Sequence, residues 1–169
     1  VMLANMEWVN VQHNALLLRH GIHPRDVTIL PRGKLEDLLE DKVDVISAYA
    51  TVEPLRMMER GFEPAMLAAM DFGVDFYGDT LFTSEAELKA HPQRVEAFVR
   101  ASLKGWKYAL DNPHEIAQII QAMPSVRKPV PTTRELMYEA REMERFIQPS
   151  LVALGHMSRV RWEFIARTF

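Results

Sequence analysis

Residues 44–54 read DVISAYATVEP, an apolar stretch that leads into an aromatic residue, a carboxylate and a proline. The run 45–48 is strand-like, because valine and isoleucine pack well on a pleated sheet. Tyr49 follows this run directly, and Glu53 and Pro54 come a few residues later. The stretch therefore predicts a strand that leads into a helix. It also raises the question of whether the turn between them is the edge of a binding cleft.

The rest of the first seventy residues continues this alternation of short apolar runs and helical stretches. The predicted strands are 1–3, 27–30, 43–48 and 65–70. The predicted helices between them are 8–20, 35–40 and 53–60, and Gly61 ends the last of these at its carboxyl end. Strands and helices that alternate at this pace predict right-handed crossovers and a small parallel sheet, which is an α/β fold.

Residues 84–169 have a different pattern, with amphipathic helices and almost no strand. Two stretches, 84–87 and 132–135, match the capping box that begins many helices. Asn112 and Pro113 also indicate a helix start. We expect these helices either to pack together as a bundle or to cover a sheet whose strands lie mostly outside this chain. The chain also starts inside a predicted strand, so we expect it to be a fragment of a longer protein.

One helix of this half allows a sharper prediction about its buried face. Phe98 and Trp106 recur at helical spacing among apolar residues and share the apolar face of one helix, which also contains Lys104 and Lys107. We therefore predict that the two aromatic rings are buried and that the two lysines are exposed.

The composition excludes several classes of function. A net charge of −3 and the scattered basic residues give no footprint for a nucleic acid. The apolar runs are too short to span a membrane. The chain has no cysteine, which excludes disulfides, thiolate metal sites and a cysteine nucleophile. The six histidines lack the spacing of a metal site, and no phosphate-binding loop or catalytic triad motif is present. We therefore expect no cofactor and no metal.

Three quoted runs resemble one known family: VDVISAYATVEPLRMMERGFEP, DFGVDFYGDTLFTSEAELKAHPQRVEAFVRASLKGWKYALDNPHEIAQII and GHMSRVRWEFIARTF. They are similar to the solute-binding proteins of the alkylsulfonate and thiamine-pyrimidine-precursor class. The resemblance implies a type II periplasmic binding protein fold, in which two α/β lobes trap a small molecule. The family's opening strands have no counterpart here, so the N-terminal part of the fold is absent.

The resemblance also implies a division of the chain and a set of partners. Residues 1–73 are expected to be the second α/β lobe, 74–82 a hinge crossing, and 83–169 the helical part of the first lobe. The implied ligand is a thiamine-pyrimidine-like heterocycle or a sulfonate-like anion, bound in the cleft between the lobes. The implied partner is a membrane permease of ABC-type uptake or a fused signalling domain. The implied location is periplasmic or extracytoplasmic, with a membrane tether in the full-length protein as one option.

Tyr49 and Glu53 allow two readings. In the structural reading, Thr51 caps a short helix and Glu53 complements its dipole. In the functional reading, Tyr49 lies beyond the carboxyl end of a strand, where open α/β sheets bind their ligands. A phenol there can stack on a planar heterocycle, and a carboxylate can accept a hydrogen bond from its amine. Both readings can hold together.

Two further segments contain candidate ligand-binding residues. Asp75, Tyr77 and Asp79 lie in the expected hinge, at the floor of the expected cleft; the alternative is a solvated turn. Asn5 and Trp8 follow the first strand, where the start of the next helix offers N–H groups to an anion. The alternative is that Asn5 is a turn residue and Trp8 a core residue.

Two other functions compete with solute binding. The family resembles eukaryotic pyrimidine synthases, but that branch carries a cysteine-rich motif and this chain has none. We therefore expect a binding protein rather than an enzyme. A helical interaction domain formed by 84–169 is the third option, and it leaves the strand-containing half unexplained.

Overall fold

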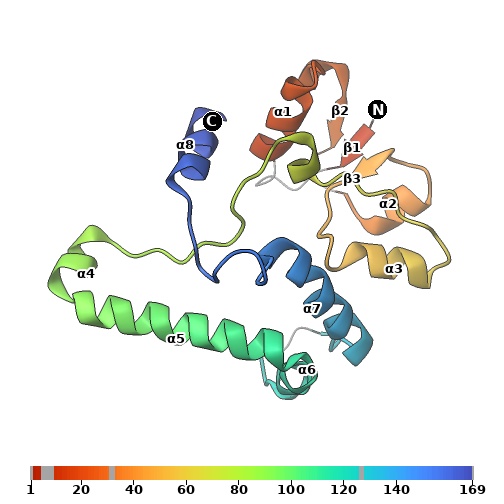
Figure 1. Cartoon of the computed structure of the whole chain (residues 1–169). Coiled ribbons are helices and arrows are strands. Elements are labelled where there is room, and N and C mark those ends of the chain that lie inside the picture. Colours follow the sequence, from red (N-terminus) through yellow and green to blue (C-terminus); the bar gives the residue numbers. More distant parts are fainter. Residues whose placement is uncertain (1, 5–9, 31–32, 126–127, 169) are drawn as a thin grey trace. The chain divides into compact units, whose positions relative to one another are not determined.

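A computed structural model of the chain describes residues 2–4, 10–30, 33–125 and 128–168. The described residues divide into two compact units. The first unit contains residues 1–77 together with 157–169, and the second contains 78–156. The elements of both units are labelled in Figure 1.

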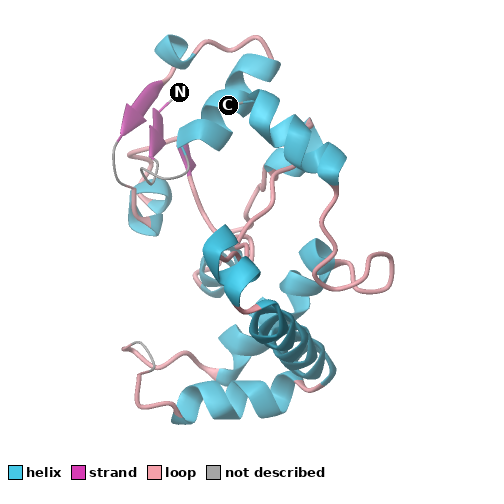
Figure 2. Cartoon of the chain, turned by 90° about the vertical axis from the view of Figure 1, so that its left-hand side faces the viewer, coloured by secondary structure: helices cyan, strands magenta, loops and turns pink. Residues whose placement is uncertain are grey.

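The first unit contains a three-stranded parallel sheet, drawn in magenta in Figure 2. Its strands are β1 (Met2–Ala4), β2 (Thr28–Leu30) and β3 (Val45–Ile46). β1 lies in the centre, and its Leu3 pairs with Ile29 on one side and Val45 on the other. The strand order is β2-β1-β3, and the parallel pairing agrees with the small parallel sheet predicted from the sequence.

Helices connect these strands and follow them. In the described part of the unit, they are α1 (Asn10–Arg19), α2 (Leu35–Leu39), α3 (Glu53–Glu59) and α8 (Arg159–Thr168), with the short 3₁₀ helices η2 (Pro24–Asp26) and η3 (Ala69–Phe72). As predicted, Gly61 lies just beyond the end of α3 in the left-handed conformation, with φ of 82°. Its N–H donates to the Met58 carbonyl at 3.0 Å, which closes the last turn.

The predicted strand at residues 65–70 is wrong. The segment is irregular until Ala69, where η3 begins, and Gly73 ends η3 with φ of 79°. The sequence AMLAAM contains no β-branched residue, and alanine and methionine favour helical conformations over strands. The apolar character of residues 65–70 therefore does not indicate which type of secondary structure they form.

The described residues of the second unit form the helices α4 (Glu85–Ala90), α5 (Pro92–Asp111), α6 (Pro113–Ala122) and α7 (Thr133–Ile147). The predicted starts of α4 and α7 are confirmed. The Ser84 hydroxyl accepts a hydrogen bond from the Glu87 N–H, and Thr132 and Glu135 form the complete reciprocal capping box. Within the described part of 84–169, all regular structure is helical.

The hydrophobic core among the described residues is small. In the first unit, it includes Val43, Leu55, Val74 and Ile165, each no more than 9% exposed.

The prediction that the two aromatic rings of α5 are buried is wrong: Phe98 is 61% exposed and Trp106 is 48% exposed. Lys104 and Lys107 are exposed, as expected. The main helix contacts of α5 are with α4 and α6, its neighbours in the chain, and these contacts leave both aromatic rings exposed.

The compact units also differ from the expected division in one respect. The sequence placed 157–169 with the helical segment 83–169, whereas α8 groups with the strand-containing unit. Side-chain contacts to residues 75–77 explain this grouping, because they join α8 to the end of the first unit's main segment. The assignment of the units to the lobes of a complete fold stays a prediction.

Candidate functional site

Tyr49 lies just beyond the carboxyl end of β3, as the sequence predicted, and it is 52% exposed. Its backbone is held in place by the helix that follows. The Tyr49 carbonyl accepts hydrogen bonds from the N–H groups of Val52 and Glu53, and its own N–H donates to Glu53 Oε2 at 2.8 Å. A rigid backbone with an exposed phenol suits contact with a planar ligand.

Glu53 is the first residue of α3, and its carboxylate fixes the turn that precedes this helix. Oε2 accepts the Tyr49 N–H, and Oε1 lies 4.0 Å from Arg56 Nη1. Pro54 occupies the first turn as expected, but the Thr51 cap does not form: the N-cap is Val52, with no side-chain bond. The structural reading of Glu53 therefore has direct support, while a ligand contact by its carboxylate stays a prediction.

Tyr77 makes three contacts with the segment that begins α8. Its hydroxyl oxygen accepts the Ser158 N–H at 2.7 Å, and its ring lies 5.0 Å from the Trp162 ring, centre to centre. The Arg161 guanidinium carbon lies 4.1 Å from the centre of the Tyr77 ring, which is a cation–π contact. Accepting a bond leaves the phenol its own O–H hydrogen, so Tyr77 can still donate to a ligand.

Asp75 is half-exposed and pairs with the same arginine. Its Oδ1 accepts a hydrogen bond from Arg161 Nη2 at 2.5 Å, and its backbone carbonyl accepts from Nε at 3.3 Å. This carboxylate is therefore already engaged within the protein. Its predicted contact with ligand stays a prediction, and the structure gives it a second role in holding Arg161.

Asp79 is exposed and belongs to the second unit, in the turn after Gly78. Asn5 and Trp8 lie outside the described residues. Of the predicted site residues, the structure therefore joins Tyr49 with Glu53 at the end of β3. It joins Asp75 with Tyr77 through Arg161.

Sequence reasoning missed Ser158, Arg161 and Trp162, the three residues that contact Tyr77 from α8 and the turn before it. They lie more than eighty positions from Asp75 and Tyr77 along the chain, so no local spacing links the two groups. The segment GHMSRVRWEF carries the family resemblance, and Trp162 and Ile165 at helical spacing predict a helix, but neither feature links it to residues 75–77. An arginine next to a tryptophan is the one local signal that it offered.

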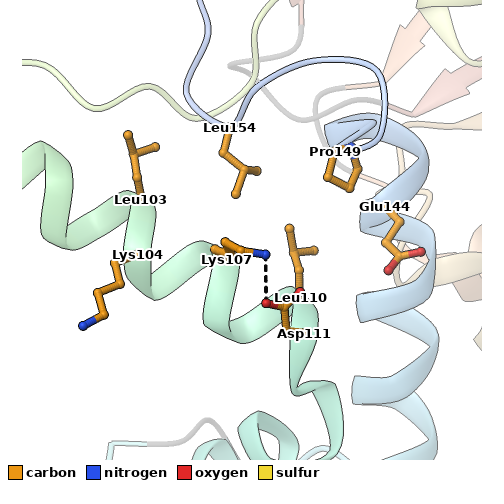
Figure 3. A pocket seen from close by; sticks show the side chains of 8 residues that line it. All are labelled: Leu103, Lys104, Lys107, Leu110, Asp111, Glu144, Pro149 and Leu154. Carbon is orange, nitrogen blue, oxygen red and sulfur yellow. Dashed lines mark hydrogen bonds and ion pairs between the residues drawn. The ribbon is translucent and has the colours of Figure 1, made fainter.

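A hollow of about 580 Å³ lies in the second unit, where α5 meets the end of α7 and the loop after it (Figure 3). Three leucines and a proline line it together with charged groups of both signs. The full lining is Leu103, Lys104, Lys107, Leu110, Asp111, Glu144, Pro149 and Leu154. Lys107 is paired with Asp111 at 3.0 Å, and Figure 3 shows Lys104 pointing away from the other lining side chains. No predicted site residue lines this hollow.

Comparison with known proteins decides the family. The family described as NMT1/THI5-like matches residues 1–116. This chain belongs to the NMT1/THI5-like family. The match confirms the resemblance inferred from the sequence, and the family's domain has a periplasmic-binding-protein-like fold.

One curated relative of the NMT1/THI5-like chain also matches. It is the riboflavin-binding protein RibY of Chloroflexus aurantiacus, which is 36% identical over 103 residues. The matched part covers 60% of this chain and 29% of RibY, so the chain spans under a third of this relative. Within the described ranges, no helix combines the length and the apolar character needed to cross a bilayer.

Proposed function

We propose that this chain contributes to the binding of a small, planar, heteroaromatic solute, with Tyr49 as a ligand-contacting residue. The observation that carries the proposal is an exposed phenol on a fixed backbone at the carboxyl edge of a parallel sheet. Ligands of open α/β sheets bind at this edge. The family match and the name of the RibY relative support small-solute binding as the general activity.

A planar heterocycle fits better than a sulfonate. The isoalloxazine of riboflavin and the pyrimidine of thiamine precursors both offer an aromatic face, which a tyrosine ring can stack on. The sulfonate alternative relied on Asn5 and Trp8 before the first helix, and these two residues lie outside the described residues. A flavin or an aminopyrimidine is therefore the class of ligand that we propose.

In the complete protein, we propose that ligand favours a closed arrangement of two lobes through the extra contacts made in that state. We propose that binding takes place outside the cytoplasm. The closed protein then delivers the solute to a membrane permease or transmits the binding event to a fused signalling domain. We propose binding without chemical change. The alternative is an enzyme related to thiamine pyrimidine synthases.

The test is binding of riboflavin and of an aminopyrimidine to the complete natural protein and to its Tyr49→Ala variant. We expect the variant to bind about 5- to 150-fold more weakly, because stacking and buried area worth about 1–3 kcal/mol are lost. The melting temperature without ligand should change little, since the ring is exposed.

Tyr49→Phe is the matched control, because it keeps the stacking surface and removes only the hydroxyl. It should retain most of the affinity if stacking dominates. An unchanged affinity in Tyr49→Ala would contradict the assigned role of Tyr49. Conversion of either compound to a new product would favour the enzyme.

A further inference from the structure

The chain crosses from the first unit to the second and later crosses back. The first-unit ends of these two connections lie in one cluster of contacting residues. The chain leaves the first unit after Tyr77 and returns at Met157. Ser158, immediately after the return, donates its N–H to the hydroxyl of Tyr77, immediately before the departure. The two connections are therefore tied to each other at their first-unit ends, although 81 positions separate the bonded residues.

Arg161 makes most of the contacts that join the two connections. Its Nε donates to the Asp75 carbonyl, and its Nη2 donates both to the Asp75 carboxylate and to the Phe76 carbonyl at 3.1 Å. The same guanidinium lies over the Tyr77 ring. Three successive residues of the departing segment are thus held by one side chain of the returning segment.

Only an arginine can make this set of contacts. Its planar fork carries several donors in fixed directions, and its flat face stacks on an aromatic ring, whereas a lysine ammonium offers one compact group of donors. Arg159, two positions earlier, provides a contrast. Its side chain is 91% exposed and pairs with Glu163, one turn further along α8.

We propose that Arg161 is a positioning residue that clamps the two connections together and thereby fixes Asp75 and Tyr77. The part of this proposal that concerns ligand affinity rests on the proposed function. In a protein that works by relative movement of two units, a clamp at both connections makes the segments 75–77 and 157–161 move as one body. Ligand contacts made by Tyr77 then depend on Arg161, which touches no ligand itself.

The first arm of the test needs no ligand. Hydrogen exchange of the Ser158 amide is measured in the complete protein, in Arg161→Lys and in the control Arg159→Lys. Arg161→Lys keeps the charge but loses the fork, so we expect the amide to exchange about tenfold faster or more, while Arg159→Lys leaves it unchanged. Unchanged exchange in Arg161→Lys overturns the clamp whether or not riboflavin binds.

The second arm measures riboflavin affinity of the same three proteins. We expect about tenfold weaker binding in Arg161→Lys and wild-type affinity in Arg159→Lys. Faster exchange with unchanged affinity overturns the positioning role. A failure of the unmodified protein to bind riboflavin counts against the proposed ligand, and the clamp is then decided by the exchange arm alone.

Discussion

His13 lies on α1, and its Nδ1 is shielded from water without a hydrogen-bond partner among the described residues. Burial lowers the pKa of His13 below its ordinary value near 6.5, because the charged ring loses hydration. The unfolded chain therefore takes up this proton at a higher pH than the folded chain does. The contribution of His13 to stability is complete above about pH 6.5, and it is lost as the pH falls through the lowered folded-state value.

We predict that His13→Leu weakens the dependence of stability on pH between pH 7.5 and 5.5. The free energy of unfolding of the wild-type chain should fall across this range, and that of the variant should fall less, because leucine takes up no proton. Denaturant titrations at four pH values measure this. His114→Gln, which removes an exposed histidine from α6, should keep the wild-type slope. Equal slopes for His13→Leu and wild type would contradict the prediction.

The candidate site shows which single residues could be predicted from the sequence. Tyr49 was found because its position depends only on the strand that precedes it. Glu53 was ambiguous, since a carboxylate at a helix start has a structural use as well as a functional one, and its bond to the Tyr49 N–H shows that use. Arg161 could not be found, because its partners are distant in the sequence and no periodicity connects them.

At the scale of elements, helices were easier to predict than strands. Helix starts depend on a few neighbouring residues, and the Thr132–Glu135 capping box formed as its sequence indicated. Strands require a partner, and a short apolar run alone does not say whether one is present. The run at 65–70 failed for this reason, as well as for its lack of β-branched residues.

The helix α5 provides a prediction at this scale, through Trp106. Because its ring is about half exposed in this chain, Trp106→Ala should cost about 1–2 kcal/mol of unfolding free energy, less than the roughly 3–5 expected for a fully buried ring. Denaturant unfolding measures the difference, and Lys104→Ala on the same helix is the control with little expected effect. A cost above about 3 kcal/mol in the complete protein would mean that another surface covers this face of α5 there.

At the scale of the whole molecule, the first unit is discontinuous in sequence. Residues 2–77 supply the sheet and its helices, and α8 joins them from the other end of the chain. Ile165 of α8 is buried at 9% exposure, and Phe164 lies with its ring 6.3 Å from that of Phe76. The amphipathic pattern of α8 predicts a helix, but this pattern does not indicate which of the two units the helix packs against.

The last prediction tests this grouping through Ile165→Ala. Removing a buried branched side chain should destabilise the unit to which α8 belongs by about 2–4 kcal/mol. Native-state hydrogen exchange should then show lost protection in the described strands and helices of residues 2–77, with smaller changes in α5, α6 and α7. Val160→Ala is the matched control, because Val160 is on the same helix and is 75% exposed, so protection should stay near that of wild type. If Ile165→Ala instead lowers protection mainly between residues 85 and 147, then α8 belongs with the helical unit, as the sequence first suggested. In that case the contacts of Arg161 with Asp75 and Tyr77 would be too weak to define a unit.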